Sequence, residues 1–241
     1  MPAEPPATLR PPLRAVTFDV TGTLLVPRDL GRLYSEVLER HGVSIPVAAV
    51  ERLFGQVLDE QRVIADAYRD PYSANPVGAR GFWADVVARL LVLHGSPPAT
   101  RVAVAELWER FRRADAWRVL PRVEETLHGL RDRGLRLGVI ANWDQRLEEV
   151  LAAVGLLPLF AAVVRSSAVG WAKPHPAIFR EALRRLGVEA DQALHVGDDP
   201  LRDVEGARAV GMAALLAGGR EAPLQPVVAH LVAAGGASPS R

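Results

Sequence analysis

The stretch AVTFDVTGTL, residues 15–24, decides the fold of this chain. An apolar run leads straight into Asp19, and Gly22 follows shortly after it. A strand that is apolar on both faces is typical of a parallel sheet covered by helices on each side. The carboxyl ends of such strands line a ligand crevice, so we expect Asp19 at the mouth of a binding site. Gly22 permits a tight turn whose backbone N–H groups face an anion.

Four further apolar runs are predicted to join this strand in one sheet. Helical patterns lie between them, and several end at a glycine, as helices often do. The alternation predicts an α/β fold with a doubly wound parallel sheet. The five predicted strands are Ala15–Phe18, Leu135–Ala141, Ala162–Val164, Ala193–Val196 and Ala213–Leu216. The helices predicted between them are Val123–Arg133, Arg146–Val154, Pro176–Leu186 and Asp203–Val210.

Residues 29–116, between the first strand and the rest of the sheet, carry helical patterns and no clear strand. Four helices of this size can bury a small core of their own. We therefore expect a helical domain at 29–116, inserted into an α/β core made of 13–28 and 117–234. Residues 1–12 are predicted to form a disordered tail and 235–241 a flexible one. The helices predicted in this insertion are Leu30–His41, Val47–Tyr68, Arg80–His94 and Thr100–Ala114, and its side chains expected near the site are Tyr72, Asn75 and Arg80.

The composition is that of an ordinary globular protein, with 49% hydrophobic and 24% charged residues. A net charge of +1 over 241 residues predicts neither nucleic acid nor an anionic membrane as a partner. The absence of cysteine excludes disulfides, a thiol nucleophile and thiolate metal ligands. No apolar stretch has the length of a membrane span, and the proline-rich start does not resemble a signal peptide. A cytoplasmic protein is therefore expected.

Polar residues follow three of the other predicted strands. Asn142 comes after the second strand, Lys173 lies on the loop after the third, and Asp198 ends the fourth. A single acid in such a place is often a turn or cap residue. Asp198, Asp199 and Asp203, however, would repel one another unless a cation lies among them. Oxygen ligands without cysteine favour a hard ion, Mg²⁺ first.

Lys173 is the one lysine among 29 Lys and Arg residues. Lysine carries a compact point charge, whereas arginine carries a broad planar fork. A lysine kept in an arginine-rich chain is either a chance surface residue or a cation in a narrow place between anions. Pro174 holds Lys173 in an extended loop, at the same edge of the predicted sheet as Asp19.

These motifs together resemble the haloacid dehalogenase superfamily of aspartate-nucleophile hydrolases. The resemblance implies a Rossmann-like core, a helical cap that closes over the site, and a small phosphorylated substrate. It covers nearly the whole chain, through FDVTGTL at 18–24, FWADVVARLLVLHG at 82–95, LRLGVIANWDQRLE at 135–148, GWAKPHPAIFREAL at 170–183 and HVGDDPLRDVEGARAVGM at 195–212.

The resemblance also implies roles for individual residues. Asp19 would attack phosphorus and carry the phosphoryl group. Mg²⁺ would be bound by Asp19, the carbonyl of Thr21 and Asp198, with Asp203 supporting nearby. Lys173 would lie between the Asp19 carboxylate and the phosphoryl oxygens. The substrate phosphate would meet the backbone at Gly22 and the side chain of Asn142.

Two positions depart from the pattern of the family's phosphatases. Thr21 stands where they carry a second aspartate as general acid and base, and Ala141 stands where a Ser or Thr binds the phosphate. A threonine hydroxyl does not exchange protons usefully near neutral pH, and general acid–base catalysis typically contributes ~10²–10⁴-fold. We therefore expect a slow or narrow hydrolase that tolerates acyl and aryl phosphates best, with Asn142 standing in for the missing hydroxyl.

Two other functions remain open. The losses at Thr21 and Ala141 also suit a phosphate-binding pseudoenzyme or scaffold. A haloacid dehalogenase attacks carbon and needs no leaving-group proton, so it would tolerate Thr21. Its carboxylate substrates, however, are poorly served by a metal cage, and Asp198 with Asp199 favours Mg²⁺ here.

Overall fold

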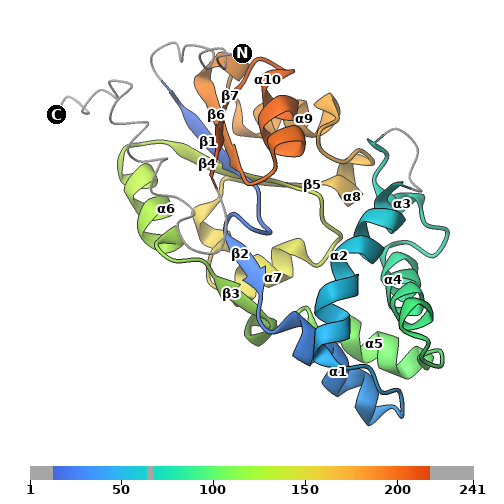
Figure 1. Ribbon diagram of the computed structural model, residues 1–241. Helices are drawn as coiled ribbons and strands as arrows, with labels where there is room; N and C mark the ends of the chain where they lie inside the picture. Colours follow the sequence, from blue (N-terminus) through green and yellow to red (C-terminus); the bar gives the residue numbers. More distant parts are fainter. Residues whose placement is uncertain (1–12, 64–67, 218–241) are drawn as a thin grey trace, which may run out of the picture.

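A computed structural model describes residues 13–63 and 68–217 of the chain (Figure 1). Its centre is a parallel sheet with the strand order β5-β4-β1-β6-β7. All five predicted strands are present, so the doubly wound α/β fold class is confirmed. The predicted tails, 1–12 and 235–241, lie outside the described residues. The sheet strands are β1 (Ala15–Phe18), β4 (Arg136–Ala141), β5 (Ala162–Arg165), β6 (Ala193–Gly197) and β7 (Ala213–Leu216).

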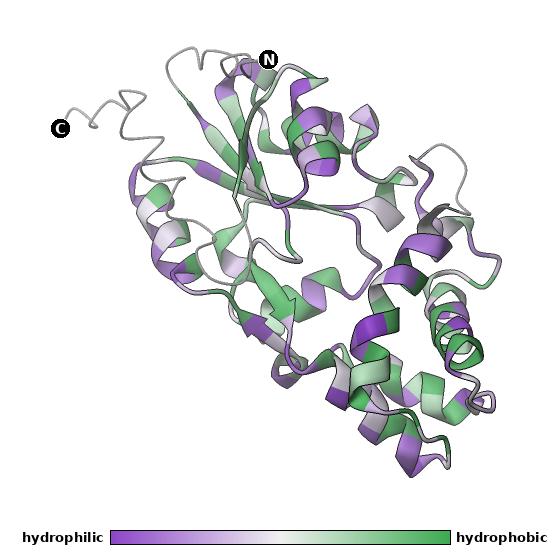
Figure 2. Cartoon of the chain, viewed as in Figure 1, coloured by the Kyte–Doolittle hydropathy of each residue, from purple (hydrophilic) through white to green (hydrophobic). Residues whose placement is uncertain are grey.

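Helices cover both faces of the sheet, and successive side chains of a strand pack against opposite faces. Val16 and Phe18 of β1 pack in one apolar cluster with α6 (Val123–Asp132) and α7 (Leu147–Ala153). Ala15 packs in a second cluster with α9 (Pro176–Leu186) and α10 (Gly206–Arg208). Apolar segments gather along the strands and on the inner faces of the helices (Figure 2). This explains why the strands are apolar on both faces.

The inserted segment is helical, as expected, and its helices gather beyond one end of the sheet (Figure 1). The aromatic pair Tyr34–Phe54 joins α1 to α2, with ring centroids 5.4 Å apart. Buried residues of these helices belong to the same apolar cluster as α6 and α7, so the insertion packs on that side of the core. The helices are α1 (Leu30–Arg40), α2 (Val47–Val63), α3 (Pro71–Ala74), α4 (Ala79–His94) and α5 (Arg101–Arg110).

Two short strands that the sequence did not predict connect the insertion to the core. β2 (Leu25–Pro27) and β3 (Trp117–Val119) pair antiparallel, with Leu25 opposite Val119. Both strands lie just outside residues 29–116, where no clear strand was expected, and neither was predicted. Strands of three residues carry too little periodicity to be recognised in a sequence. The boundaries predicted for the cap, 29 and 116, fall beside this ribbon, and the division into two domains stays a prediction.

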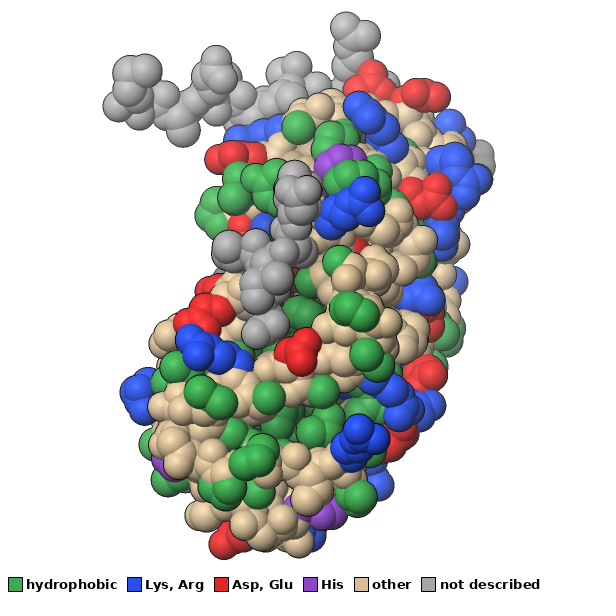
Figure 3. Space-filling model, turned by 90° about the vertical axis from the view of Figure 1, so that its right-hand side faces the viewer, with side chains coloured by type: hydrophobic (Ala, Val, Ile, Leu, Met, Phe, Trp, Pro, Cys, Tyr) green, Lys and Arg blue, Asp and Glu red, His purple; other side chains and the backbone are tan. Residues whose placement is uncertain are grey.

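The helix predicted at Asp203–Val210 is also different in the structure. It begins earlier, as a π-helix at Pro200–Glu205, and continues as the short α10. The remaining elements are the helix α8 (Ser166–Val169) and 3-10 turns at Ala114–Ala116, Leu157–Leu159 and Ala190–Gln192. None of the helices in the described part of the chain has the length and apolar character needed to cross a membrane. On the face shown in Figure 3, basic and acidic side chains are interspersed.

Candidate functional site

The carboxyl ends of β1 and β6 meet the loop before α9 in a buried group of charges. Lys173 Nζ lies 2.6 Å from Asp19 Oδ1 and 2.5 Å from Asp203 Oδ1. All three side chains are almost fully enclosed. The compact ammonium thus sits between two carboxylates, in the kind of place where a planar guanidinium is a poor substitute. Lys173 is therefore not a chance surface residue.

Asn142 holds the backbone that carries this lysine. Its Oδ1 accepts from the Lys173 backbone N–H at 2.6 Å, and its Nδ2 donates to the Lys173 carbonyl at 3.1 Å. Both polar ends of the amide are thereby occupied. The loop after β4 and the loop before α9 are joined at the point where the ammonium reaches Asp19.

A second set of contacts, to the backbone of Asp199 and to His195, positions Asp203. The carboxylate accepts from the backbone N–H of Asp199 at 3.1 Å and contacts His195 Nε2 at 3.1 Å. His195 Nδ1 lies 2.9 Å from Thr17 Oγ1, inside the sheet. Burial lowers the pKa of His195, which favours the neutral imidazole. His195 was not among the predicted site residues, although a histidine in the middle of an apolar strand was a visible signal.

The acidic residues form one cluster at this edge. Asp19, Asp198 and Asp203 each offer an oxygen, and these oxygens lie within 4.8 Å of one another. Burial raises the pKa of the Asp19 carboxyl to about 6. The Lys173 ammonium, working against burial, lowers the pKa of Asp203. Three carboxylates therefore share the single ammonium of Lys173, and the excess of acidic groups lies where the sequence predicted a cation.

Two glycines allow this close approach of backbone and carboxylates. Gly22 has φ +96°, and a Cβ placed there would lie 2.1 Å from Asp198 Oδ2. A Cβ at Gly197 would lie 2.2 Å from the Asp203 carboxylate. The turn after β1 closes through the Gly22 N–H, which donates to the Leu25 carbonyl at 2.8 Å. No side chain larger than hydrogen fits either place without moving the acids.

The two departures from the phosphatase pattern are both at the site. Thr21 is exposed on the turn after β1, and its Oγ1 accepts from Trp143 Nε1 at 2.9 Å. Ala141 is fully buried at the end of β4 and offers no polar side-chain atom. Asn142, predicted as its stand-in, uses both ends of its amide on Lys173. The residues predicted from the strand ends thus lie at one edge of the sheet, and Asn142 supports the loop that carries Lys173.

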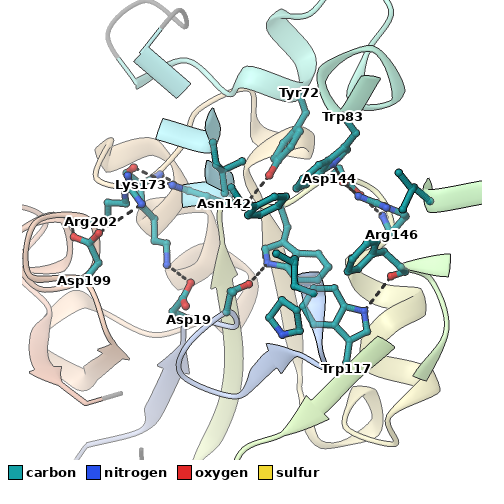
Figure 4. A pocket seen from close by; sticks show the side chains of 18 of the residues that line it. Asp19, Tyr72, Trp83, Trp117, Asn142, Asp144, Arg146, Lys173, Asp199 and Arg202 are labelled. Carbon is teal, nitrogen blue, oxygen red and sulfur yellow. Dashed lines mark hydrogen bonds and ion pairs between the residues drawn. The ribbon is translucent and has the colours of Figure 1, made fainter. Parts of the chain in front are cut away.

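A cavity of about 410 Å³ opens from these residues toward the inserted helices. Asp19, Thr21 and Lys173 line one end, and aromatic side chains from α1, α2, α5 and β3 line the other. Figure 4 shows Lys173 and Asp19 on one side of this space and Trp83 and Trp117 on the other. Of the cap residues expected near the site, Tyr72 lines the cavity, whereas Asn75 and Arg80 are not part of its lining. Those two bond to Asp85 and Glu109 within the insertion.

A buried ion pair, also not predicted, connects the loop after β4 to the inserted helices. Asp144 accepts from Arg146 through both oxygens, at 2.9 and 2.6 Å, and from Trp83 Nε1 of α4 at 2.7 Å. The Arg146 guanidinium lies over the Trp108 ring of α5, 3.8 Å from its centroid. Nearby, the Tyr72 hydroxyl donates to the Asn142 carbonyl at 3.4 Å. Core and insertion therefore contact each other directly at the cavity (Figure 4).

The fold and this edge of the sheet define a class: hydrolases with a doubly wound parallel core, carboxylates and a lysine at the strand ends, and a helical insertion above them. The chain belongs to the haloacid dehalogenase-like hydrolase family, whose family model matches residues 13–211. The resemblance of its motifs to that superfamily is thereby confirmed.

Individual relatives agree with this assignment. The chain is 41% identical to human haloacid dehalogenase-like hydrolase domain-containing protein 3 over 219 residues, which are 90% of this chain and 86% of the relative. The motifs also resemble that branch. A phosphatase of the family from Thermococcus onnurineus has 30% identity and a TM-score of 0.59, with coverage of 85% and 86%. A 2-haloacid dehalogenase from Pseudomonas syringae has 28% identity and a TM-score of 0.58, also with coverage of 85% and 86%.

Proposed function

We propose that the protein is a magnesium-dependent phosphohydrolase in which Asp19 is the nucleophile and turnover is slow or narrow. The observation that carries this proposal is the position of Lys173 Nζ, 2.6 Å from Asp19 Oδ1 at one end of the cavity. A carboxylate and a buried cation side by side supply an attacking group and neutralisation of phosphoryl charge. The likeness to a phosphatase at 30% identity supports the same chemistry.

The reaction would proceed in two displacements. Asp19 Oδ attacks phosphorus, the bond from phosphorus to the leaving oxygen breaks, and that oxygen keeps the electron pair and takes a proton from solvent. Water then attacks phosphorus, the bond from phosphorus to Asp19 Oδ breaks, and a proton from the water passes to solvent. Inorganic phosphate and the Asp19 carboxylate result. Lys173 offsets charge on the phosphoryl oxygens in both steps.

The residues present fit a divalent cation. Three carboxylates offer oxygens within 4.8 Å of one another, and hard oxygen donors suit Mg²⁺. Asp19 and Asp198 would hold the ion together with the Thr21 carbonyl, and Asp203 would support them through Lys173. When bound, the ion supplies positive charge that offsets the phosphoryl oxygens and aligns the phosphate for attack.

Thr21 limits the proposed enzyme. Its hydroxyl is held by Trp143 Nε1 and has no acidity suited to protonating a leaving group. Esters whose leaving groups are strongly basic are therefore expected to react slowly, and acyl and aryl phosphates faster. The same position would slow hydrolysis of the aspartyl-phosphate.

Thr21 and Ala141 equally favour the second candidate, a protein that binds phosphate without turnover. Phosphate release separates the two. Purified protein is incubated with Mg²⁺ and acetyl phosphate or 4-nitrophenyl phosphate, with Asp19→Asn as control. We expect release that falls at least about 100-fold in the variant and stops with EDTA. The binding protein would be established instead if phosphate stabilises the protein thermally while the wild type releases no more phosphate than Asp19→Asn does. Chloride release from a 2-haloacid without added metal would favour a dehalogenase.

A further inference from the structure

We propose that the leaving group of the substrate is an uncharged aromatic group of low basicity, held in the cavity between the sheet edge and the inserted helices. The inference rests on the proposed function, because the phosphate must lie at Asp19. It adds the chemical class of everything beyond the phosphate.

The walls of the cavity carry the first part of the argument. The cavity holds about 410 Å³, a size typical of small-molecule sites. Beyond Asp19 and Lys173 its lining is mainly aromatic and aliphatic, and the side chains come from both core and insertion. They include Tyr34, Phe54, Leu58, Phe111, Trp117 and Trp143. A flat apolar group buries its surface against such walls, whereas a sugar would leave its hydroxyls without partners.

The polar atoms of these walls are already occupied. The indole N–H of Trp143 donates to Thr21, that of Trp117 to the Phe111 carbonyl at 3.0 Å, and that of Trp83 to Asp144. These tryptophans therefore offer only ring faces and edges to a ligand. Aromatic rings pack on such surfaces in offset or edge-to-face arrangements.

The cations that line the cavity are also occupied. Lys173 bonds to Asp19 and Asp203, and Arg146 bonds to Asp144 and is covered by Trp108. Arg202 lies 3.6 Å from Asp199 and 3.9 Å from Asp59. Every cation among the described lining residues thus has a carboxylate partner. A second anionic group on the substrate would enter an apolar space with no cation to receive it.

Among the aromatic side chains of the cavity, Tyr34 keeps a polar group without a hydrogen-bond partner in the described part of the chain. Tyr34 is buried and lines the cavity, and its hydroxyl forms no hydrogen bond with any residue the structure describes. Buried hydroxyls are normally paired. An aromatic leaving group with a neutral polar substituent, such as an ester or ether oxygen, would give this hydroxyl a partner. Thr21, at the other end, requires that the leaving oxygen depart without a donated proton, which suits a phenolate better than an alkoxide.

The test compares two substrates that share a ring and differ in charge and, to a smaller extent, in leaving-group basicity, so variants of the cavity are needed to assign the difference to charge. The two substrates are the phosphate monoesters of methyl 4-hydroxybenzoate and of 4-hydroxybenzoate, with acetyl phosphate as a small substrate without a ring. We expect kcat/KM of the wild type to be at least about tenfold higher for the neutral ester than for the carboxylate. Asp19→Asn provides the background for all three substrates.

A matched pair of variants on α5 examines whether the cavity causes this preference. Val104 lines the cavity, whereas Val102 on the same helix is 65% exposed. Val104→Arg places a cation inside, so the ratio of neutral ester to carboxylate should fall about tenfold or more. Val102→Arg adds the same charge outside and should leave the ratio unchanged.

The outcomes separate the two proposals. Asp19-dependent hydrolysis of acetyl phosphate with equal kcat/KM for the two aryl phosphates would overturn the aromatic leaving group and leave the phosphohydrolase standing. An equal change of the ratio in Val104→Arg and Val102→Arg would also overturn it. Absence of Asp19-dependent release from any substrate would overturn the phosphohydrolase and the inference that rests on it.

Discussion

At the scale of single residues, Lys173 links the acidic groups of the site to one another. Its ammonium lies between Asp19 and Asp203, and Asn142 holds its backbone from both sides. The sequence predicted a cation among anions here because one lysine survived in an arginine-rich chain. It did not predict the partner Asp203, since contacts between side chains of different loops depend on how the chain packs.

Lys173→Arg provides a direct test of this geometry. A guanidinium is broader than an ammonium and must displace at least one carboxylate from a closed space. We expect kcat to fall by about 100-fold or more, because the charge remains while the alignment is lost. Steady-state phosphate release measures this, with circular dichroism to confirm folding. An unchanged kcat would show that the charge alone matters.

Thr21 can be restored toward a general acid. Thr21→Asp should raise turnover of alkyl phosphates by about 10²-fold or more if the rest of the site is assembled. Trp143 Nε1, which now donates to Thr21, would hold the new carboxylate in its ionised form. The double variant Thr21→Asp with Trp143→Phe is therefore expected to exceed the single variant, by comparison of kcat at neutral pH. A double variant no faster than the single one would exclude Trp143 as a restraint.

At the scale of elements, the parallel strands could be predicted because burial on both faces leaves a continuous apolar run. The ribbon of β2 and β3 could not, since its strands span only three residues each. Nor could the aromatic cavity, because an apolar helix face that lines a cavity has the same pattern as one that packs in a core. The acids at the strand ends were found, whereas the contact of Asp203 with His195 and the hydrogen bond from Trp143 to Thr21 were not.

The turn between β1 and β2 depends on Gly22. Gly22→Ala would bring a methyl group within 2.1 Å of Asp198 Oδ2 at φ +96°, so the turn and the carboxylate must separate. We expect Mg²⁺ affinity to fall at least about tenfold, as measured by calorimetry on the apoprotein. Gly55→Ala, in α2 with no atom within 4 Å of its added Cβ, is the matched control. Equal Mg²⁺ affinity in the two variants would contradict this account of Gly22.

At the scale of the whole molecule, core and insertion are joined at several places, and three of these contacts concern the site. The ribbon of β2 and β3 carries the chain between them, Tyr72 reaches the carbonyl of Asn142, and Asp144 with Arg146 joins the loop after β4 to α4 and α5. All three lie around the cavity. The contacts that pack the insertion on the core therefore also hold the residues around the cavity in place.

The buried pair of Asp144 and Arg146 should consequently contribute to the stability of the whole molecule. Both side chains are almost fully enclosed, so removal of one partner leaves the other charge buried and unpaired. Asp144→Asn or Arg146→Leu should each lower the free energy of unfolding by about 3–5 kcal/mol.

The double variant, Asp144→Asn with Arg146→Leu, leaves neither charge buried and should lose less than the sum of the two single losses. Urea unfolding of the wild type, the two single variants and the double variant, monitored by tryptophan fluorescence and circular dichroism, gives the coupling free energy between the two side chains. Additive losses would mean that the two side chains act independently. Loss of fluorescence before loss of helix in the single variants would show that the insertion separates from the core first, because Trp83 and Trp108 lie on its side of the ion pair.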